Sequence, residues 1–221
     1  MGKLIVIDGL DGSGKETQTN LLKERLEKAG KKVRVLSFPR YGEPSAAPVE
    51  LYLSGALGAH PSDTNAYAAS AFFSVDRYVS YVTDWKSCME EPDTVVLANR
   101  YTTANAVHQL SKLPRDEWEG FLSWLWDFEF DKLGLPHPDL TIYLEMPPTV
   151  SHRLIEKRSM QSGRKMDIHE TDSTHLEDSY RAALFASDRL GWNRICCAKD
   201  GEPLPIDVIG EEVFRCAEAL L

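Results

Sequence analysis

The sequence predicts an α/β protein in which helices flank a five-stranded parallel sheet on both faces, giving three layers. Short apolar runs alternate with longer helical patterns along the chain, and a glycine-rich loop directly follows the first run. Alternation of this kind implies parallel strands joined by right-handed crossovers. The chain has 221 residues, of which 43% are hydrophobic, and it contains no internal repeat. We therefore expect a single domain, residues 1–221, built around one core.

The predicted strands are apolar runs of about four residues each, with few polar interruptions. Such runs are typical of strands that are covered on both faces. They are residues 4–7, 33–36, 95–98, 141–144 and 195–197.

Helical periodicity is clearest between the strands. It predicts helices over 15–29, near 117–132 and over 211–221. In the second of these, Trp124 and Phe128 broaden the apolar face beyond one stripe. We expect most of this helix to be buried, in part by a partner chain.

The charge balance is acidic, with 25 Lys and Arg against 34 Asp and Glu and a formal net charge of −9. Duplex DNA and anionic membranes need a basic footprint, so neither is an expected partner. No apolar stretch is long enough to span a membrane, and the first apolar run stops at Asp8, too early for a signal peptide. The four cysteines have no CxxC or zinc spacing, and Cys196 and Cys197, which lie in a β-type run, are interpreted as core thiols. We expect a cytoplasmic protein.

The glycine-rich loop is the strongest local signal. It follows the first strand, opens the first helix, and consists of Gly9, Leu10, Asp11, Gly12, Ser13, Gly14 and Lys15. Glycines let backbone N–H groups converge on phosphate oxygens, and the helix N-terminus adds partial positive charge. The lysine supplies a full charge to the β- and γ-phosphates. This pattern predicts a P-loop that binds ATP, and its strand–loop–helix context argues against a chance glycine-rich turn.

The residue after the P-loop lysine departs from the usual pattern. A Ser or Thr that holds Mg²⁺ is normal there, but this chain has Glu16, followed by Thr17. Two interpretations remain open: metal binding is rearranged, or Thr17 serves only the α-phosphate. Both residues are expected to contact the nucleotide.

Four further segments make a family resemblance specific. They are Phe38-Pro39-Arg40-Tyr41-Gly42, Phe73-Ser74-Val75-Asp76-Arg77, Asn99-Arg100-Tyr101 with Asn105 and His108-Gln109, and the stretch 153–170 with its basic residues and Asp167-Ile168-His169-Glu170. Together with the P-loop, they resemble the thymidylate kinase family in order and spacing across nearly the whole chain. The resemblance implies the P-loop NTPase fold, transfer of the γ-phosphoryl group of ATP to dTMP, a homodimer, and Mg²⁺ as the metal.

The resemblance assigns the acceptor's 5′-phosphate to two arginines. Arg40 and Arg100 each follow a predicted strand, where a parallel sheet presents its ligands. Phosphoryl transfer depends on positioning and charge neutralisation, so arginines are suited to the task. Ordinary surface positions are the alternative for both.

The base would be read by one helix face and an amide. Phe73 and Arg77 are four residues apart and share a helix face. The resemblance places Phe73 against thymine, directs Arg77 to its O4 and pairs Asn105 with the ring edge. Phe38 would line the same pocket. Core packing is the alternative for both phenylalanines, and a helix-surface amide is the alternative for Asn105.

The resemblance also implies the catalytic groups. Asp11 would lie near the deoxyribose 3′-hydroxyl and the metal, with Glu170 as a second metal group and Glu16 as a possible third. The P-loop carries Gly12 where some family members have arginine, so a mobile lid at about 153–172 would deliver Arg158 and Arg164 to the transferred phosphoryl group. Arg153 and Lys157 fit a solvated helix face equally well.

Two more positions depart from the family pattern. Asn99 replaces an aspartate at the strand end, which removes a charge near the metal. His108 replaces an aromatic residue beneath the sugar, so it could exclude a ribose hydroxyl or hydrogen-bond one. Three functions therefore remain open: an active dTMP kinase, which we favour, a kinase of another deoxynucleotide or nucleoside, and a nucleotide-binding protein with little activity.

Overall fold

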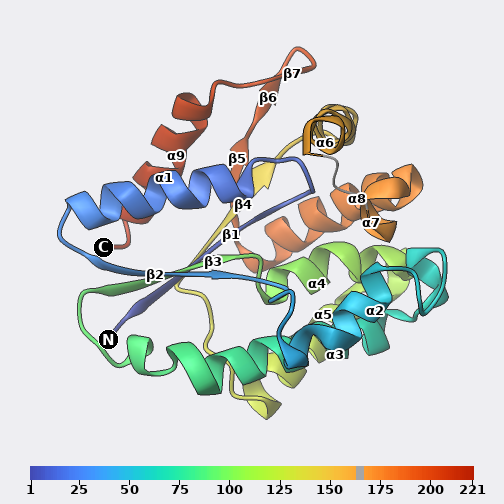
Figure 1. Ribbon diagram of the computed structural model, residues 1–221, viewed down its shortest axis with the longest axis horizontal. Helices are drawn as coiled ribbons and strands as arrows, with labels where there is room; N and C mark the ends of the chain where they lie inside the picture. Colours follow the sequence, from blue (N-terminus) through green and yellow to red (C-terminus); the bar gives the residue numbers. More distant parts are fainter. Residues whose placement is uncertain (163–166) are drawn as a thin grey trace.

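The computed structural model describes residues 1–162 and 167–221 (Figure 1). Its sheet has five parallel strands in the order β2-β3-β1-β4-β5, so the predicted α/β class and strand number are confirmed. The strands are β1 (Lys3–Gly9), β2 (Lys32–Ser37), β3 (Thr94–Asn99), β4 (Leu140–Glu145) and β5 (Asn193–Cys196).

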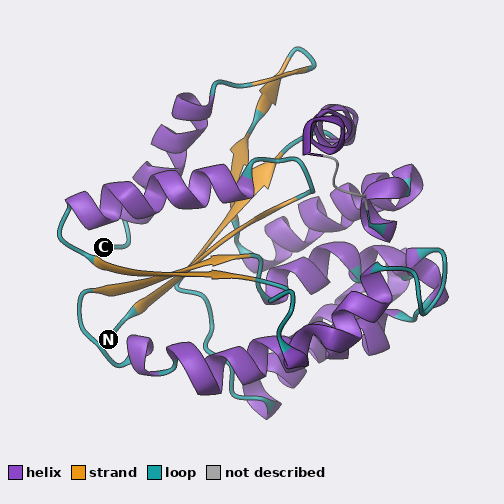
Figure 2. Ribbon diagram, in the orientation of Figure 1, coloured by secondary structure: helices purple, strands orange, loops and turns teal. Residues whose placement is uncertain are grey.

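The helices lie on both sides of this sheet (Figure 2). Those of the described chain are α1 (Lys15–Lys28), α2 (Ala47–Leu53), α3 (Ala66–Ser80), α4 (Thr102–His108), α5 (Trp118–Trp126), α6 (Pro148–Ser162), α7 (Ile168–Thr171), α8 (Ser173–Leu190) and α9 (Ile206–Glu218). Helices α1 and α9 pack on one face, while α3, α4, α5 and α8 occupy the other side of the molecule. The result is the three-layer arrangement that the alternation of patterns predicts.

The central strand β1 places the P-loop. Its apolar residues from Leu4 to Ile7 are fully buried, and it pairs with β3 on one side and β4 on the other. Ile7 lies opposite Asn99, so the ends of β1 and β3 meet at the same edge of the sheet. Ligands of open α/β sheets bind at the carboxyl ends of the strands. This register therefore brings the segment after β3 beside the P-loop.

Several boundaries differ from the prediction. Strand β2 is an edge strand with alternating exposed residues, so it is not covered on both faces. Helix α5 ends at Trp126 and continues as a π-helical turn, Asp127–Lys132. Helix α9 begins at Ile206, earlier than predicted. Pro205 is its N-cap residue, and the missing N–H of proline costs nothing there, because N–H groups at the start of a helix have no partner within the helix. A short hairpin, β6 (Ala198–Lys199) and β7 (Glu202–Pro203), was not predicted.

The segment predicted as a lid, at about 153–172, is largely helical where it is described. Helix α6 extends to Ser162, and α7 and α8 are capped by the side chains of Asp167 and Asp172. These caps accept backbone N–H groups and give each helix a defined start. Across the described ranges, no helix is long and apolar enough to cross a membrane.

Candidate active site

The P-loop has the backbone geometry that its glycines permit. Gly14 lies at the N-terminus of α1 with φ of +87°, and Gly12 has φ of +78°. A Cβ atom on Gly12 would lie 2.8 Å from the carbonyl oxygen of Ser151 on α6. Position 12 therefore requires glycine both for its backbone conformation and for the close approach of α6.

One cavity of about 390 Å³ joins the P-loop to the ends of β2 and β3 and to helices α3 and α4. Most of the sequence-predicted site residues line it: Asp11, Gly12, Gly14, Lys15, Glu16, Thr17, Phe38, Phe73, Arg77, Asn99, Arg100, Asn105, His108 and Arg158. The fold thus gathers residues from five separate segments around a single space.

Some predicted residues lie outside that lining. Gly9 and Ser13 belong to the P-loop but are not among the lining residues, and neither are Arg40 and Glu170. Arg164 lies outside the described residues.

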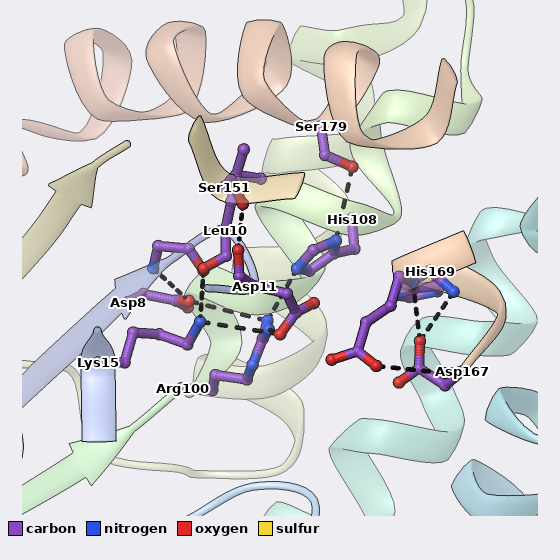
Figure 3. Close-up of polar contacts among 12 residues, drawn as sticks. Asp8, Leu10, Asp11, Lys15, Arg100, His108, Ser151, Asp167, His169 and Ser179 are labelled. Atoms are coloured by element: carbon purple, nitrogen blue, oxygen red, sulfur yellow. Dashed lines mark hydrogen bonds and ion pairs between the residues drawn. The ribbon is translucent and has the colours of Figure 1, made fainter. Parts of the chain in front are cut away.

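A cluster of charges lies at the P-loop end of the cavity (Figure 3). Arg100 Nη2 donates to Asp11 Oδ1 at 2.6 Å, and Arg100 Nη1 lies 2.8 Å from His108 Nε2. Burial favours the neutral acid, yet the positive charges of Arg100 and Lys15 hold the pKa of Asp11 well below its usual range. Burial opposes the charge of Arg100, while Asp11 and Asp8 raise its pKa. Asp11 is therefore a carboxylate between two cations.

Lys15 lies against the loop that precedes it. Its Nζ donates to the carbonyl oxygens of Gly9 at 2.9 Å and Leu10 at 2.8 Å, and lies 3.9 Å from Asp11 Oδ1. Burial, followed by the charge of Arg100, lowers the pKa of Lys15 to about 8. The Lys15 ammonium group is thus buried and lies near the positive charge of Arg100, and both of these lower its pKa.

Asp8 supports this cluster from the end of β1 and was not among the predicted site residues. It is fully buried, and its two oxygens accept from the backbone N–H of Gly9 at 2.8 Å and the hydroxyl of Thr103 at 2.5 Å. Its Oδ1 lies 4.0 Å from Arg100. A carboxylate that interrupts an otherwise apolar strand was the sequence signal that could have identified it.

Arg40 is held beside the cavity by an acidic residue of α3. Its Nε donates to Asp76 Oδ1 at 3.1 Å, its backbone N–H donates to Asp76 Oδ2, and its Nη2 donates to Ser45. Asp76 is almost wholly buried. Arg40 is therefore oriented by Asp76, which lies 36 positions further along the chain and could not be paired with it from the sequence.

The opposite end of the cavity contains Arg77 and Asn105. Both are buried, and both donate to the carboxylate of Glu129 in the π-helical turn. Arg77 and Asn105 were predicted as site residues, but Glu129 was not, because an isolated Glu near the end of a predicted helix is typical of a surface residue.

Helices α6 and α7 are joined by an ion pair. Arg158 lies on α6 and donates to Glu170 Oε1 on α7, and Glu170 Oε2 accepts the backbone N–H of Asp167. Both oxygens of Glu170 thus have protein partners. Asp167 itself lines the cavity, and burial, with the charge of Asp11, raises its pKa to about 6.

Three buried histidines connect α4, α7 and α8. His108, His169 and His175 have depressed pKa values, chiefly because of burial, and that of His175 falls to about 4. Their nitrogens lie within 4.8 Å of one another, but the ring of His108 stacks on the other two at 26° and 27°. Lone pairs lie in the ring planes, so stacked rings do not direct them to one ion. We interpret the cluster as packing between helices.

The oxygen groups of the cavity suit a hard divalent cation. Mg²⁺ prefers carboxylate oxygens and retains several waters. Asp11 and Glu16 both line the cavity at the P-loop, where the phosphates of a nucleotide would add further ligands. The donor set therefore fits Mg²⁺, although Asn99 offers only a neutral amide.

A P-loop that shares one cavity with Arg77, Arg100 and Arg158 defines a P-loop kinase of small phosphorylated substrates. The family model of thymidylate kinases matches residues 7–183. The thymidylate kinase of Mycobacterium tuberculosis is 31% identical over 86% of this chain and 87% of its own, and that of Danio rerio is 27% identical over 98% and 93%. The solved thymidylate kinase of Candida albicans covers 99% of this chain and 92% of its own with a TM-score of 0.69 at 19% identity, a likeness of fold. The chain belongs to the thymidylate kinase family, whose enzymes are nucleoside monophosphate kinases.

Proposed function

We propose that this protein transfers the γ-phosphoryl group of ATP to dTMP, producing dTDP and ADP. The observation that supports the proposal most strongly is the single cavity, which has the P-loop at one end and Phe73, Arg77 and Asn105 at the other. A donor nucleotide and a pyrimidine acceptor could meet in it end to end.

In this proposal, the P-loop binds the ATP phosphates through Lys15 and the backbone of its glycines. Arg100 and Arg40 bind the 5′-phosphate of dTMP, and Asp11 orients Arg100 and approaches the sugar 3′-hydroxyl. Catalysis then consists of aligning the two phosphates and stabilising the charge that develops between them. Lid residues Arg158 and Arg164 would add positive charge at the transferred group.

Phe73 would stack on the thymine, while Phe38 lines the same pocket. His108 would pack beneath the deoxyribose. Its Nε2 is already occupied by Arg100, and its Nδ1 lies 3.5 Å from the hydroxyl of Ser179. These contacts favour a histidine that fills space beneath the sugar over one that binds a ribose hydroxyl.

The proposed metal is Mg²⁺, held by Asp11 with Glu16 in support. When bound, it would neutralise charge on the ATP phosphates. Glu170 is a weaker metal candidate, because Arg158 and the backbone of Asp167 occupy its oxygens.

The test is ADP release from ATP across a panel of nucleoside monophosphates. We expect dTMP to be preferred to dCMP, because a buried donor that faces another donor costs about 1–3 kcal/mol, or about 5- to 150-fold in kcat/KM. Equal kcat/KM for the two nucleotides would contradict the assignment, and faster turnover of another deoxynucleotide would identify a different kinase.

A nucleotide-binding protein with little transfer activity is the second candidate. It is favoured by Glu16 and Asn99, which both line the cavity and change the charge around the metal. Tight binding of ATP and dTMP by calorimetry, without ADP release, would support it.

We further propose a homodimer in the cytoplasm with no nucleic-acid partner. Helix α3 and the turn that follows it expose an apolar stripe formed by Tyr67, Val75, Tyr78 and Val82. These positions lie on one side of the helix, and Tyr67 packs on Trp124 of α5. A second copy of the chain could cover this stripe.

A further inference from the structure

Glu129 is a fully buried acid that does not line the cavity itself but contacts Arg77 and Asn105, which do. It lies in the π-helical turn Asp127–Lys132, and its carboxylate contacts residues of α3 and α4. Burying a carboxylate is costly unless charged and hydrogen-bonded partners surround it. The contacts of Glu129 therefore indicate which side chains its carboxylate orients.

Four side chains reach the two oxygens of Glu129. Arg77 forms a bidentate pair, from Nε to Oε2 at 2.8 Å and from Nη2 to Oε1 at 2.5 Å. Asn105 Nδ2 donates to Oε1 at 3.1 Å and Thr102 Oγ1 to Oε2 at 2.7 Å. Ser74 Oγ lies 2.9 Å from Oε1 and shares its proton with the carbonyl of Ser70. All of these partners come from α3 and α4.

The contacts determine the orientation of the Asn105 amide. Its nitrogen lies near two acceptors, Glu129 Oε1 and the carbonyl oxygen of Ser70 at 3.3 Å. The reversed amide would place its oxygen against both acceptors, which is repulsive. The nitrogen therefore faces the protein, and the carbonyl oxygen is the group that Asn105 can offer to a ligand in the cavity.

Arg77 is oriented by the same carboxylate and presents the opposite polarity. In the described chain, four of its five N–H groups have acceptors: two on Glu129, the hydroxyl of Ser74 at 3.5 Å and the carbonyl of Tyr101 at 3.3 Å. The remaining N–H is on Nη1. Because Arg77 and Asn105 both line the cavity, the site offers one donor and one acceptor.

We propose that Glu129 is a positioning residue that makes this site specific for pyrimidines with a carbonyl at C4. Thymine and uracil present N3–H and O4, which match the Asn105 oxygen and the Arg77 N–H. Cytosine presents an N3 acceptor and a 4-amino donor, so both polarities conflict. This inference rests on the proposed function and adds the residue that fixes the polarity of the base pocket.

The experiment measures kcat/KM for dTMP and dCMP with the wild-type enzyme and with Glu129→Gln. A glutamine leaves Arg77 without its countercharge. It also places an NH₂ group opposite the donors that now contact the carboxylate, so the amide of Asn105 is no longer held in one orientation. We expect the dTMP:dCMP ratio to fall by about tenfold or more. Because both substrates are assayed on the same preparation, the ratio is independent of the fraction of enzyme that is folded.

The matched control is Asp127→Asn, the same chemical change in the same turn. Asp127 pairs with Lys132 at the surface, so the ratio should not change. Should Glu129→Gln fail to fold, Glu129→Asp keeps the charge but withdraws it by one methylene, and its ratio should also fall. A ratio that is unchanged while both kcat/KM values decrease together would show a purely structural role and overturn the inference. A wild-type enzyme that does not accept dTMP would instead overturn the proposed function.

Discussion

Lys15 couples the phosphate site to pH. Its pKa is lowered to about 8 by burial and by Arg100. A lysine loses its charge as pH rises through its pKa, so the free enzyme should lose this cation above about pH 8. We expect kcat/KM for ATP to fall along an alkaline limb near that pH. The decline of kcat should occur at higher pH, because bound phosphates favour the ammonium form.

Steady-state kinetics across this pH range check the prediction, with Lys112→Arg as the control. Burial lowers the pKa of Lys112 to about 7, so this lysine of the described chain also titrates near this window. Its replacement by arginine removes that titration and keeps the charge. If the alkaline limb disappears in Lys112→Arg, the limb does not belong to Lys15.

The second prediction at the residue scale concerns Glu16, Asn99 and the Mg²⁺ requirement. Relative to the usual pattern, one position has gained a carboxylate and the other has lost one, so the charge around the metal is roughly conserved. We expect Glu16→Ala to raise the Mg²⁺ concentration needed for half-maximal activity by about threefold or more and to lower kcat. Adding Asn99→Asp should restore part of the loss, and a double-mutant cycle measures this coupling.

Glu24→Ala is the control, because Glu24 is an exposed residue of the same helix. An unchanged Mg²⁺ dependence in Glu16→Ala would mean that this side chain faces solvent without assisting the metal.

At the scale of elements, the histidine cluster links the stability of the α4–α7–α8 packing to pH. Folding lowers the pKa of His108, His169 and His175 below the unfolded value of about 6.5. The unfolded chain therefore binds more protons, so the stabilisation is complete above about pH 6.5 and is lost as pH falls toward the folded pKa values, about 4 for His175.

Asp167, with its pKa raised to about 6, acts in the opposite direction and offsets part of the loss. Of the other charged groups that face the cluster, Lys112, Arg100 and Lys15 favour neutral imidazoles, and Asp11 and Asp172 oppose them.

We expect the free energy of unfolding to be lower at pH 5 than at pH 7. His175→Asn should reduce this difference by about 2 kcal/mol. Denaturant titrations at the two pH values measure it, and His152→Asn, at a partly exposed site on α6 outside the cluster, serves as the control. Equal pH dependence in the wild type and His175→Asn would show that His175 does not titrate on unfolding.

For the whole molecule, the exposed stripe on α3 predicts how two copies associate. Val82 is 50% exposed in an apolar setting, and a charge at the centre of an interface opposes association unless it is paired. We expect Val82→Glu to weaken the dimer by about tenfold or more. Sedimentation velocity over a concentration series measures this change.

Val208→Glu is the control for that experiment. Val208 is a similarly exposed valine, 46%, but lies on α9 on the other side of the sheet. Equal weakening by both substitutions would show that the α3 stripe is not the interface.

The sequence by itself determined the strand order along the chain, the P-loop and most of the cavity lining. The first two depend on local information, whereas most of the cavity residues outside the P-loop were expected from the family resemblance. A short apolar run indicates a strand, and glycines at fixed spacing indicate a backbone conformation that only glycine adopts readily. Parallel strands also end at one edge of a sheet, so residues after β1, β2 and β3 were expected to converge, and most of them line one cavity.

Only the tertiary structure decided which partners hold these residues. Arg77 and Glu129 are 52 positions apart, and Arg40 and Asp76 are 36 apart. No periodicity connects positions at such separations, so their pairing depends on how α3 packs against the segments that follow β2 and α5. The histidine cluster depends in the same way on three helices meeting. Buried polar groups are stable only with partners, and the partners are chosen by packing across the molecule rather than by neighbours along the chain.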